Sequence, residues 1–422
     1  MFKIPRGTRD FTPVEMQKRR YVEEIIRKTF QKFGYKEIQT PTFETLELFT
    51  AKSGEAIINE MYIFKDKASR DLALRPELTA PVMRFYVDKL QMEPKPLKLF
   101  YFGNCFRYDR PQKGRYREFM QAGCELIGAD TPEAYAELIA LAFSILKNVG
   151  LKNIKLNIGN LNILSHIFKI FNITKEQKNK LIPLIDKSNF DEIILNLKEY
   201  GLSETDIKKF IEVLQTSDFK IIFELCEKNP VIKNEIIKLN EILELLKNIF
   251  EIKNYEIKIS IVRGLDYYKG IVFEIDAPIL GAEKQLCGGG EYELIPLFGG
   301  KETPTSGFAI GFDRTILALE LEKYVFPQTK LDYYIIPVNE QLTNKSLEIT
   351  HNLRKQGFFV DVDLLKRGLS KSLKYASSIN VDKIIIIGEK ELKNESVTIR
   401  DMKTGRQELI KIDLLYKKNK LS

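Results

Sequence analysis

The spacing of apolar positions changes several times along the chain. Residues 12–15 (TPVE) read as a capping box with proline at the first helical position, and the apolar residues that follow lie on one helical stripe. Beyond residue 36 the period shortens to about two, which is typical of strands. This pattern predicts strands over residues 37–42, 61–64, 98–107 and 118–127. A helix over residues 132–149 is expected to pack after this sheet.

The stretch from about residue 160 to 250 has a helical period instead. Residues 203–206 (SETD) cap one apolar stripe, and Pro230 precedes another. We therefore predict a helical module inserted into a sheet protein. Sheet character returns over residues 256–262 and 271–275, and a helix is predicted over residues 314–323.

A boundary follows at Phe326-Pro327. Three apolar runs beyond it, residues 333–338, 358–362 and 383–387, are separated by helical patterns. This alternation indicates β-α-β units around a partly parallel sheet. Because the chain has 422 residues, more than one hydrophobic core is expected, and the last part is predicted to be a separate α/β domain.

Composition narrows the choice of compartment and metal. The net charge of +8 suits a polyanionic partner, although many enzymes without one carry as much. The four cysteines show no CxxC spacing, and the two histidines lie in helix-like segments, so no His/Cys metal site is expected. The chain begins without an apolar signal core, and no apolar run approaches the ~20 residues of a membrane span. We expect a cytoplasmic protein with no membrane contact.

The segments over residues 98–107 and 118–127 look like a hairpin with a long cationic loop. Alternation places Gln121 and Glu125 on one face of the second strand, opposite a core face. Arg107 ends the first strand. Such a face could be a substrate floor or a solvated surface with an ion pair. The basic loop favours a phosphate-bearing ligand.

Four further segments could bind ligands, and each has a structural alternative. Glu77, in LRPELTA, could pair with a ligand ammonium or cap a helix. The tyrosines of RGLDYYKG could bind a ligand or fill a core, and the glycines after Cys287 could admit a ligand or form a turn. Arg314 follows a predicted strand at the start of a helix, which favours a place near the site over a solvated helix end. No Walker or dinucleotide fingerprint occurs, so arginines must hold any nucleotide.

In this order, the segments resemble the class II aminoacyl-tRNA synthetases, and among them the histidyl-tRNA synthetase family. Residues 34–41, 106–121 and 307–314 resemble class II motifs 1, 2 and 3. RGLDYYKG at residues 263–270 and CGGGEY at residues 287–292 resemble the two signature peptides of the histidine family. Residues 368–376, 384–392 and 396–407 resemble its anticodon-binding domain.

The resemblance implies an α+β catalytic domain with an antiparallel sheet, the class II synthetase fold. This domain would comprise residues 1–158 and 253–325, interrupted by a helical insertion over residues 159–252. A C-terminal α/β anticodon-binding domain would follow over residues 328–422. The family also implies a homodimer formed through motif 1.

The same resemblance assigns roles in the activation of L-histidine with ATP. Arg107 would hold the α-phosphate, Arg314 the γ-phosphate, and Arg263 would stabilise charge at the α-phosphate. The implied histidine contacts are Glu77 and Thr79 for the α-amino group, Gln121 for the carboxylate, Glu125 and Tyr268 for the imidazole, and Tyr267 beside it. Gln112, Arg115 and Arg117 would contact the acceptor end of tRNA(His). Mg²⁺ is expected to accompany ATP.

One departure from the family pattern is visible. Glu291 and Glu293 stand where the second signature usually has arginine and aspartate. Two alternatives to the enzyme are a regulatory subunit of ATP phosphoribosyltransferase, which shares the fold, and a non-catalytic tRNA-binding sensor. The presence of Arg107, Arg263 and Arg314 together with the C-terminal domain argues against both.

Overall fold

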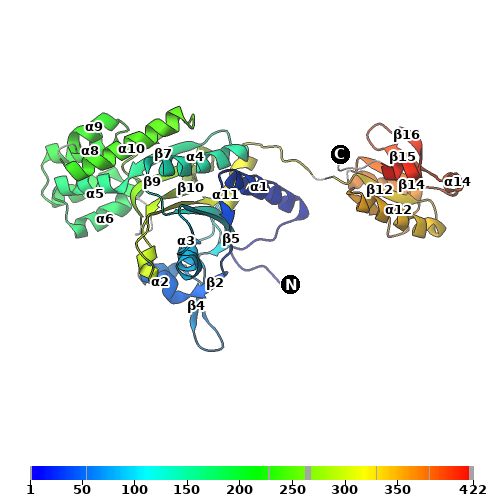
Figure 1. The fold of residues 1–422 in the computed structure, drawn as a ribbon, viewed down its shortest axis with the longest axis horizontal. Coiled ribbons are helices and arrows are strands. Elements are labelled where there is room, and N and C mark those ends of the chain that lie inside the picture. Colours follow the sequence, from blue (N-terminus) through cyan, green and yellow to red (C-terminus); the bar gives the residue numbers. More distant parts are fainter. Residues whose placement is uncertain are drawn as a thin grey trace. The chain divides into compact units, whose positions relative to one another are not determined.

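A computed structural model describes residues 2–53, 55–226, 229–261, 268–328, 330–379 and 381–417. The chain divides into two compact units, Met1–Phe326 and Pro327–Ser422. Figure 1 traces both units. Over the described ranges, no helix has the length and apolar character needed to cross a membrane.

A large sheet forms the centre of the N-terminal unit. Its strand order, within the described residues, is β1-β5-β6-β11-β10-β9-β7-β8. The bounds in that order are Lys36–Glu37, Leu97–Phe106, Glu118–Ile127, Thr305–Gly311, Gln285–Tyr292, Tyr268–Asp276, Lys155–Asn160 and Tyr255–Ile257. The strands from β5 to β7 in this order pair antiparallel, and only the outer strands β1 and β8 pair parallel with their neighbours. The predicted antiparallel catalytic sheet is confirmed.

Helices α1 (Pro13–Lys32) and α4 (Pro132–Asn148) cover one face of this sheet (Figure 1). Helix α1 begins at the predicted capping box, in which Thr12 and Glu15 bond each other's backbone N–H. Phe30 of α1 stacks on Phe100 of β5 with ring centroids 4.8 Å apart. This face therefore holds the main core of the unit.

The opposite face is covered as well. Helix α3 (Thr79–Phe85), the turn η2 (Tyr86–Leu90) and the turn η4 (Ile295–Phe298) pack over β5, β6 and β10. Beside them lie α2 (Leu46–Ser53), η1 (Glu55–Glu60) and a small sheet of β2 (Phe43–Thr45), β4 (Asp71–Leu74) and β3 (Ile63–Lys65). Because α3 lies over it, Glu125 is only 1% exposed, and the alternative of a solvated outer face is wrong there.

The predicted strand over residues 37–42 is shorter than expected. Strand β1 ends at Glu37, and β2 begins only at Phe43. Between them, the carbonyls of Thr40 and Pro41 accept hydrogen bonds of 2.9 and 3.0 Å from the buried guanidinium of Arg75. Proline has no N–H for a ladder, so this stretch pairs with a side chain instead of a strand.

Helices dominate the segment between β7 and β8, as the sequence predicts. They are α5 (Leu161–Ile170), α6 (Lys175–Asp186), α7 (Phe190–Glu199), α8 (Glu204–Gln215), α9 (Phe219–Cys226) and α10 (Pro230–Asn248). Ser203 caps α8, accepting from the N–H of Asp206. Their buried side chains are continuous with the core beneath α4. The last helix of the unit, α11 (Phe312–Leu321), begins two residues before the predicted position.

The C-terminal unit contains a sheet of order β13-β12-β14-β15-β16. Its strands are Val360–Val362, Tyr333–Pro337, Lys383–Ile387, Ser396–Asp401 and Gln407–Lys411. Strand β12 pairs parallel with β13 and β14, whereas the other two pairs are antiparallel. The remaining elements are η5 (Glu340–Leu342), α12 (Thr343–Lys355), α13 (Leu369–Ser378), α14 (Glu389–Lys393) and α15 (Ile412–Lys417). The predicted partly parallel sheet is confirmed.

Candidate active site

Strand register brings the predicted binding residues of β6 onto the face beneath α3. Gln121 lies opposite Gly103 of β5, and Glu125 lies opposite Leu99 of β5 and Gly307 of β11. A Cβ at Gly307 would come within 1.9 Å of the Glu125 carboxylate. Glycine is therefore required at this position of motif 3, because the neighbouring strand carries the glutamate.

Glu125 is the centre of a buried hydrogen-bond network. The hydroxyl of Tyr101 donates to one carboxylate oxygen at 2.9 Å, and the hydroxyl of Tyr292 donates to the other at 2.5 Å. Burial raises the pKa of Glu125 to about 8, against the opposing effect of the Tyr292 and Tyr101 hydrogen bonds. A buried carboxyl held by fixed donors is suited to bind one polar ligand group in a dry pocket.

Glu77 and Thr79 stand at the start of α3. The carboxylate of Glu77 accepts from the backbone N–H of Thr79 at 2.7 Å and of Ala80 at 3.0 Å, so the predicted capping contact is present. The Thr79 side chain lowers the pKa of Glu125 by hydrogen bonding, whereas the charge of Glu77 raises it. The first turn of α3 and the buried carboxyl of β6 therefore face the same space.

Gln121 and Tyr268 border the same network. The Cys105 thiol donates to the Gln121 side-chain oxygen at 3.3 Å. Tyr268, at the start of β9, packs its ring edge-on against Tyr292 with centroids 6.2 Å apart. The predicted binding residues Arg263 and Tyr267 lie outside the described residues.

A cationic cluster lies near the loop of the hairpin. Arg107 follows β5, and its Nε donates to the carbonyl of Pro76 at 2.9 Å. Arg314 lies in the first turn of α11, where Nε donates to the Gly114 carbonyl at 2.9 Å and one terminal nitrogen donates to the Gln285 carbonyl at 3.1 Å. Burial lowers the pKa of Arg314, the charge of Glu283 opposes this effect, and the charges of Arg115 and Arg107 add to it. Guanidinium groups held in this way can bind an anion through charge-assisted hydrogen bonds.

We call residues 108–117 the motif 2 loop. Gln112 and Arg115 close its tip with paired backbone hydrogen bonds. Their side chains have protein partners, because Gln112 donates to Glu283 at 2.7 Å and Arg115 donates to Asp109 at 3.1 Å. Arg117 donates to the Asp109 carbonyl at 3.1 Å. A contact of these three side chains with another molecule would therefore compete with protein contacts or add to them.

The sequence reading missed several residues of this region. Tyr101 and Tyr292 were not assigned to the Glu125 network, although Tyr292 belongs to the CGGGEY segment and Tyr101 lies on the site face of β5. Asp313 was missed too. Its buried carboxylate accepts from Arg9 at 2.7 Å, Arg19 at 2.6 Å and the backbone N–H of Met120 at 2.7 Å. Asp313 thereby joins motif 3 to motif 2 and to α1.

Lysine side chains lie close to Glu291 and Glu293, the two glutamates that depart from the family pattern. Lys238 of α10 lies 3.8 Å from Glu291, and Lys269 lies 4.0 Å from Glu291 and 3.3 Å from Glu293. Burial raises the pKa of Glu291, which the two lysines oppose. The reversed charge is therefore balanced locally, partly by a residue of the helical segment.

The glycines after Cys287 form the middle of β10, so the alternative of a plain turn is wrong. A Cβ at Gly289 would lie 2.3 Å from the Gly307 carbonyl, and one at Gly290 would lie 2.4 Å from the Ile271 carbonyl. At these two positions glycine is required by the close approach of neighbouring strands.

No cluster that could hold a metal ion occurs among the described His, Cys, Asp and Glu residues. Cys105, Cys124 and Cys287 are buried and are not joined in disulfides. His166 lies in α5 of the first unit and His351 in α12 of the second.

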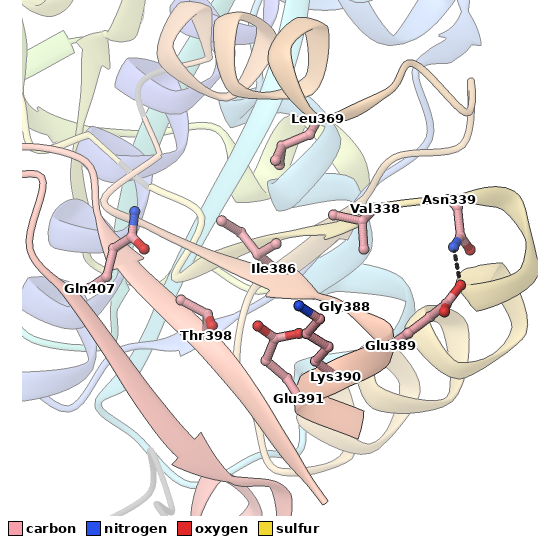
Figure 2. Close-up of a pocket in the computed structure, with 10 residues that line it drawn as sticks. All are labelled: Val338, Asn339, Leu369, Ile386, Gly388, Glu389, Lys390, Glu391, Thr398 and Gln407. Atoms are coloured by element: carbon pink, nitrogen blue, oxygen red, sulfur yellow. Dashed lines mark hydrogen bonds between the residues drawn. The ribbon is translucent and has the colours of Figure 1, made fainter. Parts of the chain in front are cut away.

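The C-terminal unit has a cavity of about 400 Å³ at the carboxyl ends of β12 and β14 (Figure 2). Val338 and Gly388 follow these two parallel strands, and Asn339 donates to Glu389 at 2.6 Å across the opening. Thr398 and Gln407 line the other side. Carboxyl ends of parallel strands are a common place for ligand sites in α/β folds.

The antiparallel sheet, with arginines after the first hairpin strand and at the head of the motif 3 helix, defines the catalytic unit of a class II aminoacyl-tRNA synthetase. The model of the family Histidyl-tRNA synthetase matches residues 7–315, and the model Anticodon binding domain matches residues 332–420. The chain belongs to the histidyl-tRNA synthetase family.

Known relatives agree over nearly the full chain. The "Histidine--tRNA ligase" of Methanocaldococcus jannaschii is 46% identical over 98% of this chain and 99% of that protein. The protein of the same name from Archaeoglobus fulgidus is 44% identical over 98% of each chain. The crystal structure of apo histidyl-tRNA synthetase from S. aureus is 32% identical, with a TM-score of 0.77 over 99% of this chain and 100% of that chain.

Proposed function

We propose that this chain is a histidine–tRNA ligase that activates L-histidine with ATP and transfers it to the 3′ end of tRNA(His). The observation that carries the site assignment is the buried Glu125 network on the hairpin whose first strand leads into Arg107 and whose loop binds Arg314 of α11. Family membership supports the reaction, and the residue roles below are the proposal.

Glu125 and Tyr268 would hold the two imidazole nitrogens of histidine, with Tyr267 beside the ring. Glu77 and Thr79 would bind the α-amino group, and Gln121 would lie near the carboxylate. A buried carboxyl with fixed tyrosine donors should discriminate strongly between histidine and apolar amino acids. An apolar side chain would leave the buried polar groups of the pocket without a partner, which costs about 1–3 kcal/mol of binding free energy per group.

ATP would bind at the cationic end of the site. Arg107 would hold the α-phosphate and Arg314 the γ-phosphate, while Arg263 would stabilise charge on the α-phosphate. An oxygen of the histidine carboxylate attacks the α-phosphorus, and the bond to the pyrophosphate oxygen breaks. This step needs positioning and charge neutralisation more than a proton-transfer group, and fixed guanidinium groups provide both.

Mg²⁺ would arrive with ATP. Mg²⁺ is usually bound by one or two carboxylates together with substrate phosphates. Its chemistry would be to neutralise phosphate charge.

The tRNA would contact both units. Gln112, Arg115 and Arg117 are proposed to meet the acceptor end, near a helical insertion over residues 159–252. Residues 328–422 are proposed to bind the anticodon, in agreement with the domain match. The enzyme is proposed to act in the cytoplasm.

We also propose a homodimer formed through motif 1. Phe43, which lies just beyond this motif, and Phe64 of β3 are 51% and 39% exposed and pack edge-on against each other. Exposed apolar pairs of this kind suit a protein interface. Sedimentation of the purified chain tests the proposal, and a monomer at micromolar concentration would contradict it.

The rival function is the regulatory role named for one structural neighbour, "ATP phosphoribosyltransferase regulatory subunit/histidyl-tRNA synthetase", which is 24% identical and supports the fold alone. The intact Arg107 and Arg314 and the C-terminal unit favour catalysis.

Histidine-dependent exchange of labelled pyrophosphate into ATP, without tRNA, tests the proposal. Exchange with histidine and with none of the other amino acids is the expected result. A folded protein that binds histidine but gives no exchange would support the regulatory role instead.

A further inference from the structure

The proposed γ-phosphate arginine already has an anionic partner in the protein. Glu283, the last residue of the turn η3 (Pro278–Glu283), forms a short ion pair with a terminal nitrogen of Arg314. The side chains of Arg314 and Glu283 are 24% and 20% exposed, so this pair is largely shielded from water. A carboxylate thus stands where the proposed function requires a phosphate.

Glu283 also binds the motif 2 loop. Gln112 donates to its carboxylate at 2.7 Å, and Arg115 lies 3.9 Å from the same oxygen. Gly114, at the loop tip, lies close to the side chains of both Glu283 and Arg314. One carboxylate therefore connects the motif 3 arginine with two of the three side chains proposed for the acceptor end of tRNA.

ATP and Glu283 cannot share Arg314 without repulsion, because a triphosphate and a carboxylate carry like charges. The triphosphate has more charge and more acceptor oxygens, so it is the stronger partner for the cationic cluster. Once Glu283 leaves Arg314, its contacts with Gln112 and Arg115 must change as well.

We propose that Glu283 is a positioning residue that holds Arg314 and the motif 2 loop together in the ligand-free enzyme and is displaced by the phosphates of ATP. Displacement frees Gln112 for the acceptor end of tRNA and leaves Asp109 as the carboxylate partner of Arg115. The inference rests on the proposed function, since it takes Arg314 as a phosphate ligand.

The first test compares Glu283→Gln with wild type in histidine-dependent pyrophosphate exchange. Loss of the competing charge should lower the KM for ATP about threefold to tenfold, the range expected for a partly shielded ion pair, with little change in kcat. Glu283→Asp keeps the charge on a shorter side chain and should give an intermediate KM. Glu302→Gln removes a charge from an exposed loop position and should match wild type.

The second test is hydrogen exchange of residues 108–117. Pyrophosphate should raise the exchange rate of this loop in wild type, and Glu283→Gln should show the raised rate without ligand. If Glu283 only stabilised the fold, Glu283→Gln would not lower the KM for ATP.

An unchanged or higher KM for ATP in Glu283→Gln would overturn the inference, as would a higher Mg²⁺ requirement, which would make Glu283 a metal ligand. If wild type gives no pyrophosphate exchange, the proposed function fails on its own. Loop exchange with pyrophosphate still tests the role of Glu283 in that case.

Discussion

The Glu125 end and the Arg314 end of the proposed site differ in how their charged groups are buried and paired. At the Glu125 end, a single carboxyl is buried and held by two tyrosine hydroxyls. At the Arg314 end, several guanidinium groups keep partial access to water and form ion pairs with Glu283 and Asp109. The first arrangement suits selection of one small ligand, and the second suits neutralisation of a polyanion. Substitutions at the two ends should therefore affect different kinetic constants.

The largest expected effect is that of Glu125→Ala. Losing a buried, hydrogen-bonded partner of the ligand should cost about 3 kcal/mol, so the KM for histidine should rise ~150-fold in pyrophosphate exchange. The KM for ATP should stay near the wild-type value, because Glu125 lies at the other end of the site. Equal changes in both constants would remove Glu125 from the imidazole pocket.

Arg263→Ala should lower kcat and leave histidine binding intact. If Arg263 stabilises charge at the α-phosphate, kcat should fall about a hundredfold, as for loss of one oxyanion-stabilising donor. Histidine binding, followed by calorimetry, should remain. Near-normal activation would exclude an electrostatic role for this residue.

Tyr292→Phe sharpens the comparison within the Glu125 end. The change removes one hydrogen bond to a carboxylate while keeping the ring beside Tyr268. A loss of about 1–1.5 kcal/mol predicts a five- to twelvefold rise in the KM for histidine. Tyr334→Phe, in the C-terminal unit, is a matched control that should leave pyrophosphate exchange unaltered.

The pH dependence of histidine affinity should also distinguish the Glu125 end from the Arg314 end. With a pKa of about 8 in the free enzyme, the ionised fraction of Glu125 increases about fivefold between pH 7 and pH 8. If the carboxylate accepts from a neutral imidazole, histidine affinity should rise by the same factor. Glu125→Gln should abolish this rise, and a persistent rise in that variant would assign it to another group.

The same raised pKa affects stability. The pKa of Glu125 in the folded protein lies above the ordinary value of 4.5. Its stabilising contribution to the free energy of unfolding is therefore fully present below about pH 4.5 and is lost as pH rises through about 8. Glu125→Gln should therefore unfold at a temperature that depends less on pH between those limits.

The smallest effect is expected in the C-terminal unit. Gln407 lines the cavity of Figure 2. Gln407→Ala should raise the KM for tRNA(His) about threefold, because one proposed, partly exposed hydrogen bond between this side chain and the tRNA is lost. Pyrophosphate exchange without tRNA should not change. An altered KM for histidine in this variant would contradict the separation of the two functions.

The sequence predicted the elements with strong periodicity and missed contacts that depend on register. Strand alternation placed Gln121 and Glu125 on one face, and the capping box located the start of α1, because both are local patterns. Burial of Glu125 depends on α3 lying over the sheet, and its bond to Tyr292 joins two strands that are far apart in the chain. The Glu283–Arg314 pair likewise joins two segments that no local pattern relates.

A crystal structure with histidine and a non-hydrolysable ATP analogue tests the central claim most directly. The account predicts an imidazole nitrogen within hydrogen-bond distance of Glu125 and the triphosphate at Arg107 and Arg314. An imidazole bound away from Glu125, or a triphosphate that leaves both arginines on their present protein partners, would contradict it.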